Sequence, residues 1–322
     1  KWNGTSWVQQ TVPATPSFYG AWGTSASSLW IVGDNGTIYK WDGSAWSPVQ
    51  SSGTTNHLRG IWGADANNIW AVGEVGTILK WDGASWKPQV SGTTSFLRGI
   101  YGLDASNIWV VGDGGTILRW DGTKWSSMVS GTTRTLYSVW ALAVNNVWAV
   151  GANGTILRQS GSTWGPENSG RTDTLYSVWG VDQNNLWAVG ATGTILIRSG
   201  SPNWSSQAGA AAGVTLNRIW GLDTSHIWAV GTSNAIYYNN GFVWSLWDAK
   251  FGSDWYFDVW GTSKTSVWFV GFFGTGGGIR YDSTTPKYQV SGTDNGLSAV
   301  WGAGPNNVWT VGDHGTILQW SP

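Results

Sequence analysis

The feature that most constrains the fold is a motif that recurs along the whole chain at intervals of 39 to 41 residues. Its centre reads Trp-x-Val-Gly, and the tryptophan of that centre recurs as Trp30, Trp70, Trp109, Trp148, Trp187, Trp228, Trp268 and Trp309. A repeat of this length is typical of propellers, solenoids and arrays, in which each copy is one supersecondary unit. The sequence therefore predicts eight such units.

Each copy contains four short apolar runs separated by turn residues, which is a strand pattern and not a helix pattern. In the second copy the runs are Leu58–Trp62, Ile69–Val72, Thr77–Trp81 and Trp86–Val90. Asp82-Gly83 lies between the third and fourth runs, and this dipeptide favours a two-residue type I′ hairpin turn. One repeat therefore predicts a four-stranded antiparallel meander.

The second and third runs of a copy are apolar on both faces, so both faces need cover. Blades that pack side by side in a ring provide that cover, and a ring also leaves only short edges. The two ends of the chain are complementary, since Lys1–Trp7 matches the end of a third strand and the start of a fourth, while Trp320 ends a copy that lacks its fourth strand. We therefore expect an all-β fold: a single eight-bladed β-propeller of four-stranded antiparallel blades, with the ring closed by the N-terminal strand.

The spacing of the repeats gives approximate blade boundaries over one domain of residues 1–322. We expect blade 1 at 13–50, blade 2 at 51–90, blade 3 at 91–129, blade 4 at 130–168, blade 5 at 169–208, blade 6 at 209–248, blade 7 at 249–290, and blade 8 at 291–322 together with strand 1–12.

Three sequence elements carry a resemblance to known propellers: the GxxGTIL element, the SGTTxxL lead-in and a D-G-x-x-W turn, as in Asp42–Trp46, Asp82–Trp86 and Asp121–Trp125. Together they resemble the repeats of Asp-box propellers and of the photosystem II assembly-factor family. The Trp-Asp dipeptides are more distantly similar to WD-repeat proteins. The resemblance implies a Trp-rich propeller fold, but it implies no particular activity because propellers host unrelated functions.

Composition excludes several classes of function. The chain has 11% charged residues, a net charge of −1, 29 tryptophans and no cysteine. It therefore has no disulfide framework, and the absence of a basic stripe argues against nucleic acid as a partner. No apolar run approaches the ~18 residues of a spanning helix, which argues against membrane insertion. We expect an extracellular or cell-surface module, with no signal sequence in this chain.

Residues that carry catalysis are scarce. Glutamate occurs only at Glu74 and Glu167, and neither has a partner carboxylate nearby in the sequence, whereas glycoside hydrolysis usually needs two placed carboxylates. Three scattered histidines and no cysteine give no recognisable zinc site. The sequence therefore predicts no enzyme, no catalytic residue, no metal and no cofactor.

One candidate site lies near the ring axis. Two positions before the first-strand aromatic, six copies carry small residues, whereas two adjacent copies carry Arg218 and Asp258. We expect these two side chains to form a polar pair beside the channel. The pair is either a structural ion pair or part of a ligand site in the channel.

A second candidate site comes from the two irregular loops of the sixth and seventh copies, which should emerge on the same face. Aromatic rings with a few polar groups are suited to a sugar or a peptide. The alternative is a small satellite core under a long loop. The expected cluster comprises Trp247, Asp248, Phe251, Asp254, Trp255, Phe272 and Phe273, with Lys250 among them.

Taken together, these features favour a non-catalytic binding module, in first place a carbohydrate-binding, lectin-like propeller whose partner is a glycan. The alternative is a module for protein–protein interaction or structural scaffolding, with a partner protein. A second alternative is a glycoside hydrolase or lyase of the Asp-box type. Equivalent sites in several blades would favour the lectin, and a single site would favour a dedicated partner.

Overall fold

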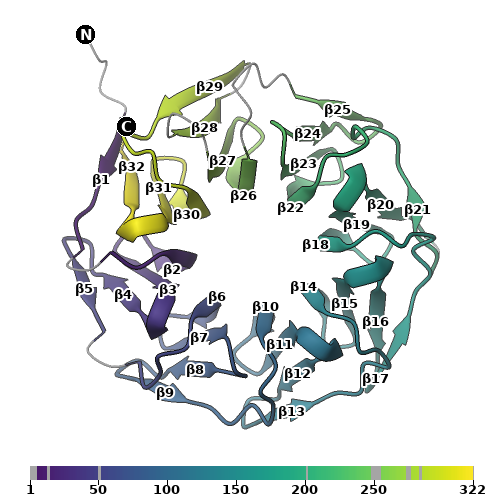
Figure 1. Ribbon diagram of the computed structural model, residues 1–322, viewed down its shortest axis with the longest axis horizontal. Helices are drawn as coiled ribbons and strands as arrows, with labels where there is room; N and C mark the ends of the chain where they lie inside the picture. Colours follow the sequence, from purple (N-terminus) through teal and green to yellow (C-terminus); the bar gives the residue numbers. More distant parts are fainter. Residues whose placement is uncertain are drawn as a thin grey trace.

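The chain forms a closed ring of sheets (Figure 1), and the innermost strands surround a central channel. The computed structural model describes residues 6–12, 15–49, 52–200, 202–247, 255–272, 277–282 and 285–321. Within these residues, 32 strands form eight four-stranded antiparallel sheets, and each sheet is one blade of a β-propeller.

From the channel outward, the first four blades follow chain order. Their strands are β2 (Phe18–Ser25), β3 (Ser28–Gly33), β4 (Ile38–Trp41) and β5 (Trp46–Pro48); β6 (Leu58–Asp65), β7 (Asn68–Gly73), β8 (Ile78–Trp81) and β9 (Trp86–Pro88); β10 (Leu97–Asp104), β11 (Asn107–Gly112), β12 (Ile117–Trp120) and β13 (Trp125–Ser127); and β14 (Leu136–Ala143), β15 (Asn146–Gly151), β16 (Ile156–Ser160) and β17 (Thr163–Pro166).

The remaining blades repeat the arrangement. Their strands are β18 (Leu175–Asp182), β19 (Asn185–Gly190), β20 (Ile195–Arg198) and β21 (Ser205–Ser206); β22 (Leu216–Asp223), β23 (His226–Gly231), β24 (Ile236–Asn239) and β25 (Trp244–Leu246); β26 (Trp255–Ser263), β27 (Ser266–Phe272), β28 (Gly277–Asp282) and β29 (Thr285–Val290); and β30 (Leu297–Gly304), β31 (Asn307–Gly312), β32 (Ile317–Ser321) and β1 (Ser6–Gln9).

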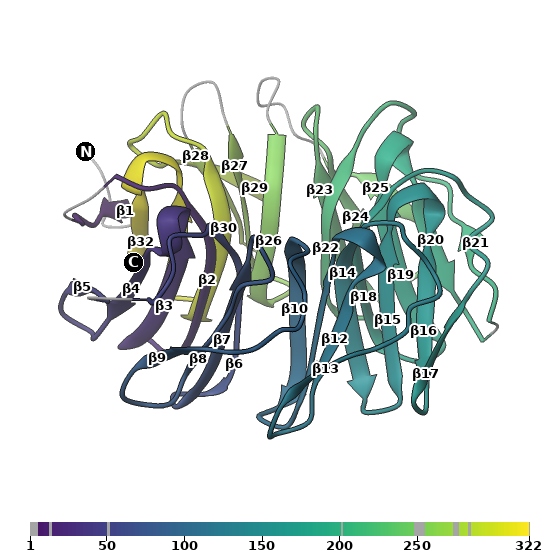
Figure 2. The ribbon, with the colours of Figure 1, turned by 60° about the horizontal axis from the view of Figure 1, so that its bottom comes forward.

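Short 3-10 turns follow the second strand in five blades and lie on one face of the ring, the upper one in Figure 2. They are η1 (Asp34–Gly36), η2 (Asp113–Gly115), η3 (Ala152–Gly154), η4 (Ala191–Gly193) and η5 (Asp313–Gly315). The inner strands begin on this same face, which we call the turn face.

The N-terminal strand closes the ring, as the complementary ends indicated. β1 pairs antiparallel with β32, from Ser6 opposite Ser321 to Gln9 opposite Leu318. The indoles of Trp7 and Trp320 meet edge to face with ring centroids 5.6 Å apart. The first residues of the chain therefore complete the sheet that contains its last strand.

The hairpin between the third and fourth strands differs from the expected two-residue type I′ turn. Trp41 pairs with Trp46, so the loop has four residues, and of these only Gly43 has a positive φ, at 101°. The Asp42 carboxylate accepts the N–H groups of Ser44 and Ala45 at 2.8 and 2.9 Å. These bonds, with that of Ala45 foremost, lower the pKa of Asp42 to about 2. The type I′ prediction was wrong because the carboxylate, and not a second left-handed residue, holds the loop.

The core lies between blades. The indole of Trp30 packs on Trp81 and Trp86 of the next blade, with centroids 4.6 and 5.5 Å apart. Trp81 and Trp86 are therefore only 9% and 6% exposed, although they flank the exposed hairpin loop. Each blade covers the outer tryptophans of its neighbour, so the fold depends on the closed ring.

Candidate binding site at the channel mouth

The inner strands of all eight blades line a central cavity of about 490 Å³. Its wall contains three arginines, Arg59, Arg98 and Arg218, and one carboxylate, Asp258. The charged groups therefore lie on four blades, and the same repeat positions on the other blades are neutral.

Arg218 and Asp258, the polar pair expected near the axis, are in contact. Arg218 Nε donates to Asp258 Oδ1 at 3.1 Å, and Asp258 Oδ2 accepts the backbone N–H of Val300 at 3.0 Å. Burial raises the pKa of Asp258, against the opposing effect of the Arg218 charge. The Arg218 side chain is 52% exposed, so its guanidinium faces the open channel. A ligand role for the pair stays a prediction.

The predicted aromatic cluster is brought together only in part. Trp255 and Phe272 are opposite each other at the turn-face end of β26 and β27, and they are 53% and 49% exposed. Trp247 instead packs on Phe269 of β27 with ring centroids 5.5 Å apart, as a partly buried side chain against the core. The other predicted members, Asp248, Phe251, Asp254 and Phe273, together with Lys250, lie outside the described residues.

A further set of residues at the mouth was not predicted. They share the position three before the first-strand aromatic, at the turn-face end of the inner strands, and all are half-buried. The set is Tyr19, Arg59, Arg98, Tyr137, Tyr176, Asn217, Phe257 and Ser298.

Neighbours in this set stack on one another across blades 1 to 5. The Arg59 guanidinium lies 3.7 Å from the centroid of the Tyr19 ring. Arg98 lies between Phe96 and Tyr137, at 4.4 and 5.4 Å. The rings of Tyr137 and Tyr176 are 5.2 Å apart. We call Tyr19, Arg59, Phe96, Arg98, Tyr137 and Tyr176 the mouth arc.

Carboxylates at the start of the turns hold the mouth arc in place from its outer side. Asp34 accepts the hydroxyl of Tyr19 at 2.8 Å. Arg98 donates from Nε and Nη2 to the two oxygens of Asp113, at 2.5 and 3.0 Å. This pairing lowers the pKa of Asp113 and raises that of Arg98. These hydrogen bonds fix the side chains of Tyr19 and Arg98 before any ligand arrives, which reduces the entropy lost on binding.

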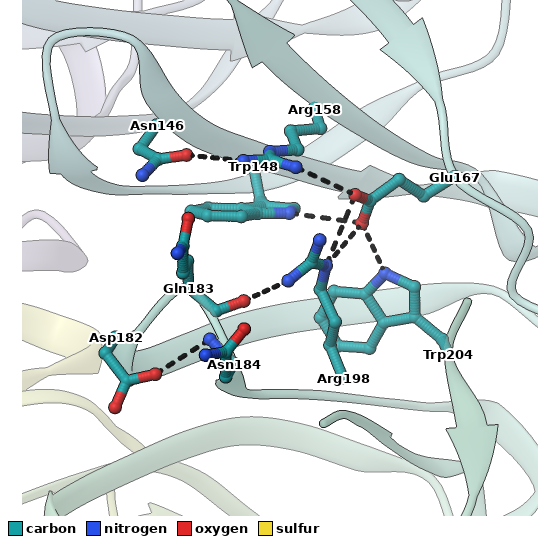
Figure 3. Close-up of polar contacts among 9 residues, drawn as sticks. All are labelled: Asn146, Trp148, Arg158, Glu167, Asp182, Gln183, Asn184, Arg198 and Trp204. Carbon is teal, nitrogen blue, oxygen red and sulfur yellow. Dashed lines mark hydrogen bonds and ion pairs between the residues drawn. The ribbon is translucent and has the colours of Figure 1, made fainter. Parts of the chain in front are cut away.

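Glu167 belongs to a buried polar network at the boundary of blades 4 and 5 (Figure 3). The side chains of Glu167 and Arg198 are 6% and 5% exposed and 3.2 Å apart. Glu167 also accepts the indole N–H groups of Trp148 and Trp204, at 3.2 and 2.8 Å. Because the donors come from both blades, the network joins blade 4 to blade 5. The Glu167 carboxylate is buried and its oxygens are already hydrogen-bonded, so it is not open to a substrate.

Over the described ranges no three His, Cys, Asp or Glu side chains gather in a way that could hold a metal ion. No helix within those ranges has the length and apolar character needed to cross a membrane.

The comparisons with known proteins establish the class of fold. No protein-family model matches the sequence, and no curated protein matches it. Among solved structures, YCF48 bound to D1 peptide covers 100% of this chain and 96% of its own, with 15% identity and a TM-score of 0.62. The C-terminal WD40 domain of Sif2 covers 98% and 99%, with 13% identity and a TM-score of 0.74.

A propeller enzyme is also similar. A catalytically inactive virginiamycin B lyase from Staphylococcus aureus covers 99% of both chains, with 13% identity and a TM-score of 0.66. The chain is thus a Trp-rich β-propeller, and its solved neighbours include YCF48 and WD40 propellers, in line with the resemblance seen in the repeats. At these identities the likeness shows the fold alone.

Proposed function

We propose that this propeller is a non-catalytic module that binds a segment of a partner protein across the mouth of its channel. The observation that carries the proposal is the mouth arc. Most buried positions of the repeat keep one kind of apolar residue from blade to blade, but the half-buried position three before the first-strand aromatic carries Tyr, Arg, Asn, Phe or Ser. Variation at an accessible position of a largely constant scaffold is expected where a ligand is recognised.

The chemistry of the arc suits a peptide. Arginine and tyrosine are enriched among residues that dominate binding energy at protein interfaces. Guanidinium groups stacked on rings present both a charged edge and flat apolar surface. The solved neighbours support the same kind of partner, since one is bound to a peptide and another is a WD40 domain.

Selection of peptides offers a direct test. A random peptide library is selected on the whole protein, and the affinity of each selected peptide is then measured for wild type and for Arg59→Ala/Arg98→Ala. We expect a loss of at least about tenfold in the double variant, in the range of a binding hot spot. Lys124→Ala, at an exposed hairpin on the outer rim, is the matched control and should bind as wild type does. Equal affinities for wild type and the double variant would overturn the proposal.

The carbohydrate hypothesis depends on a different observation, the exposed pair Trp255 and Phe272. Flat rings of this kind stack on sugars as well as on peptides. A glycan array probed with wild type and with Trp255→Ala tests it separately: binding that is lost in the variant would favour a glycan. An array without signal would leave the peptide as the remaining partner.

A further inference from the structure

Blade 3 shows how this propeller holds a guanidinium group. Arg98 stacks on the ring of Phe96 at 4.4 Å, and it donates two hydrogen bonds to the carboxylate of Asp113. A ring on one side and a carboxylate at the edge use both features of a guanidinium, its flat face and its fork of N–H groups. The three residues define a seat for an arginine side chain.

Blade 8 keeps only part of this seat. Asp313 opens its turn as Asp113 does, and the register is the same, since Leu297 pairs with Gly312 as Leu97 pairs with Gly112. At the place of Phe96 the chain has Gly296, and at the place of Arg98 it has Ser298. The carboxylate is therefore retained, but the ring and the arginine of blade 8 itself are absent.

The neighbouring blade supplies a ring in place of the missing one. A Cβ atom built on Gly296 would lie 2.8 Å from Asp313 Oδ2 and 3.6 Å from Cδ2 of Phe272 in blade 7. Asp313 Oδ2 and the Phe272 ring thus lie on the same side of Gly296, and we call the surface between this carboxylate and this ring the recess. Phe272 is 49% exposed, and Trp255 beside it is 53% exposed, so the ring presents part of its surface at the turn-face end of the strands.

No described cation fills this recess. The equivalent carboxylates all have a basic partner: Asp34 has His57 at 2.7 Å, Glu74 has Arg59 at 3.8 Å, and Asp113 has Arg98. Among the residues that the structure describes, no lysine, arginine or histidine forms an ion pair with Asp313.

We propose that the recess between Phe272 and Asp313 binds an arginine side chain of the partner segment. This inference rests on the proposed function and names the chemistry of one residue of the partner. The incoming guanidinium would lie on the Phe272 ring and donate to Asp313, as Arg98 does on Phe96 and Asp113 within the chain. Lysine fits less well, because an ammonium group offers neither a flat face nor a paired donor.

A small probe tests the recess without knowledge of the partner. The whole protein, labelled with ¹⁵N, is titrated with N-acetyl-arginine amide and with the neutral isostere N-acetyl-citrulline amide. We expect the arginine compound to shift the amide signals of Gly296 and Asp313 and the indole signal of Trp255. The citrulline compound should shift them at least about tenfold more weakly, since charge-assisted hydrogen bonds are the stronger kind.

Three variants locate the effect. Asp313→Asn and Phe272→Ala should each reduce the response to the arginine compound. Ser298→Arg should abolish it, because the new side chain can fill the recess from within, as Arg98 fills that of blade 3. Asp121→Asn, at an exposed hairpin on the outer rim, is the control and should leave the response at Gly296 unchanged.

The outcomes separate this inference from the proposed function. Equal responses to the two compounds, or an unchanged response in Asp313→Asn, would overturn the arginine seat. A response that needs Phe272 but not Asp313 would also overturn it and would point to an apolar side chain. The affinity of the selected peptides for the mouth arc is measured independently of the response to the arginine compound. Either proposal can therefore be overturned while the other stands.

Discussion

The indole of Trp22 in blade 1 lies against the backbone of Gly63 in blade 2. A Cβ atom on Gly63 would fall 2.5 Å from Cη2 of Trp22, which no real contact allows. The same contact between an indole and a glycine of the next blade recurs around the ring, for example between Trp62 and Gly102. Blade 3 has the smaller Tyr101 at the position of Trp22, and the next blade has the larger Ala141 at the position of Gly63. The inner ring is thus matched in size blade by blade.

This match predicts a rescue. Gly63→Ala should destabilise the protein by ~1–3 kcal/mol, as overpacking of a filled site does. Trp22→Tyr in the same chain should recover most of the loss by reproducing the pair Tyr101 and Ala141. Denaturant midpoints of the two single variants and the double variant give the coupling energy. Additive effects would show that the two residues do not share the contact.

The buried pair Glu167 and Arg198 gives a second prediction. Glu167→Ala should cost ~3–5 kcal/mol, because it leaves a buried guanidinium without its counter-charge. The chain itself contains an apolar version of this boundary, in which Val49 and Trp81 hold the equivalent positions. Glu167→Val/Arg198→Trp should therefore be close to wild type in thermal melting. A double variant as unstable as the single one would contradict this.

Much of the fold could be predicted because the repeat is strict. Turn residues recur between apolar runs, so strands and their order follow from the sequence alone, and the complementary ends indicated the pairing of β1 with β32. The hairpin turn could not be predicted from Asp42-Gly43, since a carboxylate can hold a four-residue loop that the dipeptide alone does not specify.

The candidate site was predicted less well. The irregular copies indicated Trp255 and Phe272, and adjacent departures indicated Arg218 and Asp258. Trp247 follows the same pattern in the sequence, but its ring contacts Phe269 and packs against the core. The mouth arc was missed because stacking partners such as Tyr19 and Arg59 are 40 residues apart and become neighbours only when consecutive blades pack side by side. Variation at a fixed repeat position was the signal that could have found it.

Val75 carries backbone strain that can be removed. Its φ is 53°, in the left-handed region, although it is β-branched and 58% exposed. The same position holds Asn35, Gly114 and Asn153 in other blades. Val75→Asn should stabilise the protein by ~1 kcal/mol, since a left-handed conformation costs a residue such as valine roughly 1–2 kcal/mol, whereas the short polar side chain of asparagine tolerates it. The reverse change, Gly114→Val, is the control and should destabilise by a similar amount. Equal melting temperatures for wild type and Val75→Asn would refute the assignment of strain.

The last prediction concerns ring closure by the N-terminal strand. Removal of residues 1–12 takes away β1 and leaves β32 as an unpaired edge, with Trp320 stripped of its contact to Trp7. Trp7 is 8% and Trp320 0% exposed in the closed ring, so the deletion uncovers a large apolar surface beside free backbone groups. An edge of this kind pairs readily with other chains. We expect the truncated protein to lose its single cooperative melting transition, which circular dichroism would detect, and to associate, which light scattering would detect. The matched control is Trp7→Ala/Val8→Ala, which keeps the backbone pairing and removes only side chains. It should lower the melting temperature without association, whereas association in the control would assign the effect to the lost tryptophan and not to the open edge. A truncated protein that melts as wild type does would show that β1 is dispensable for closure.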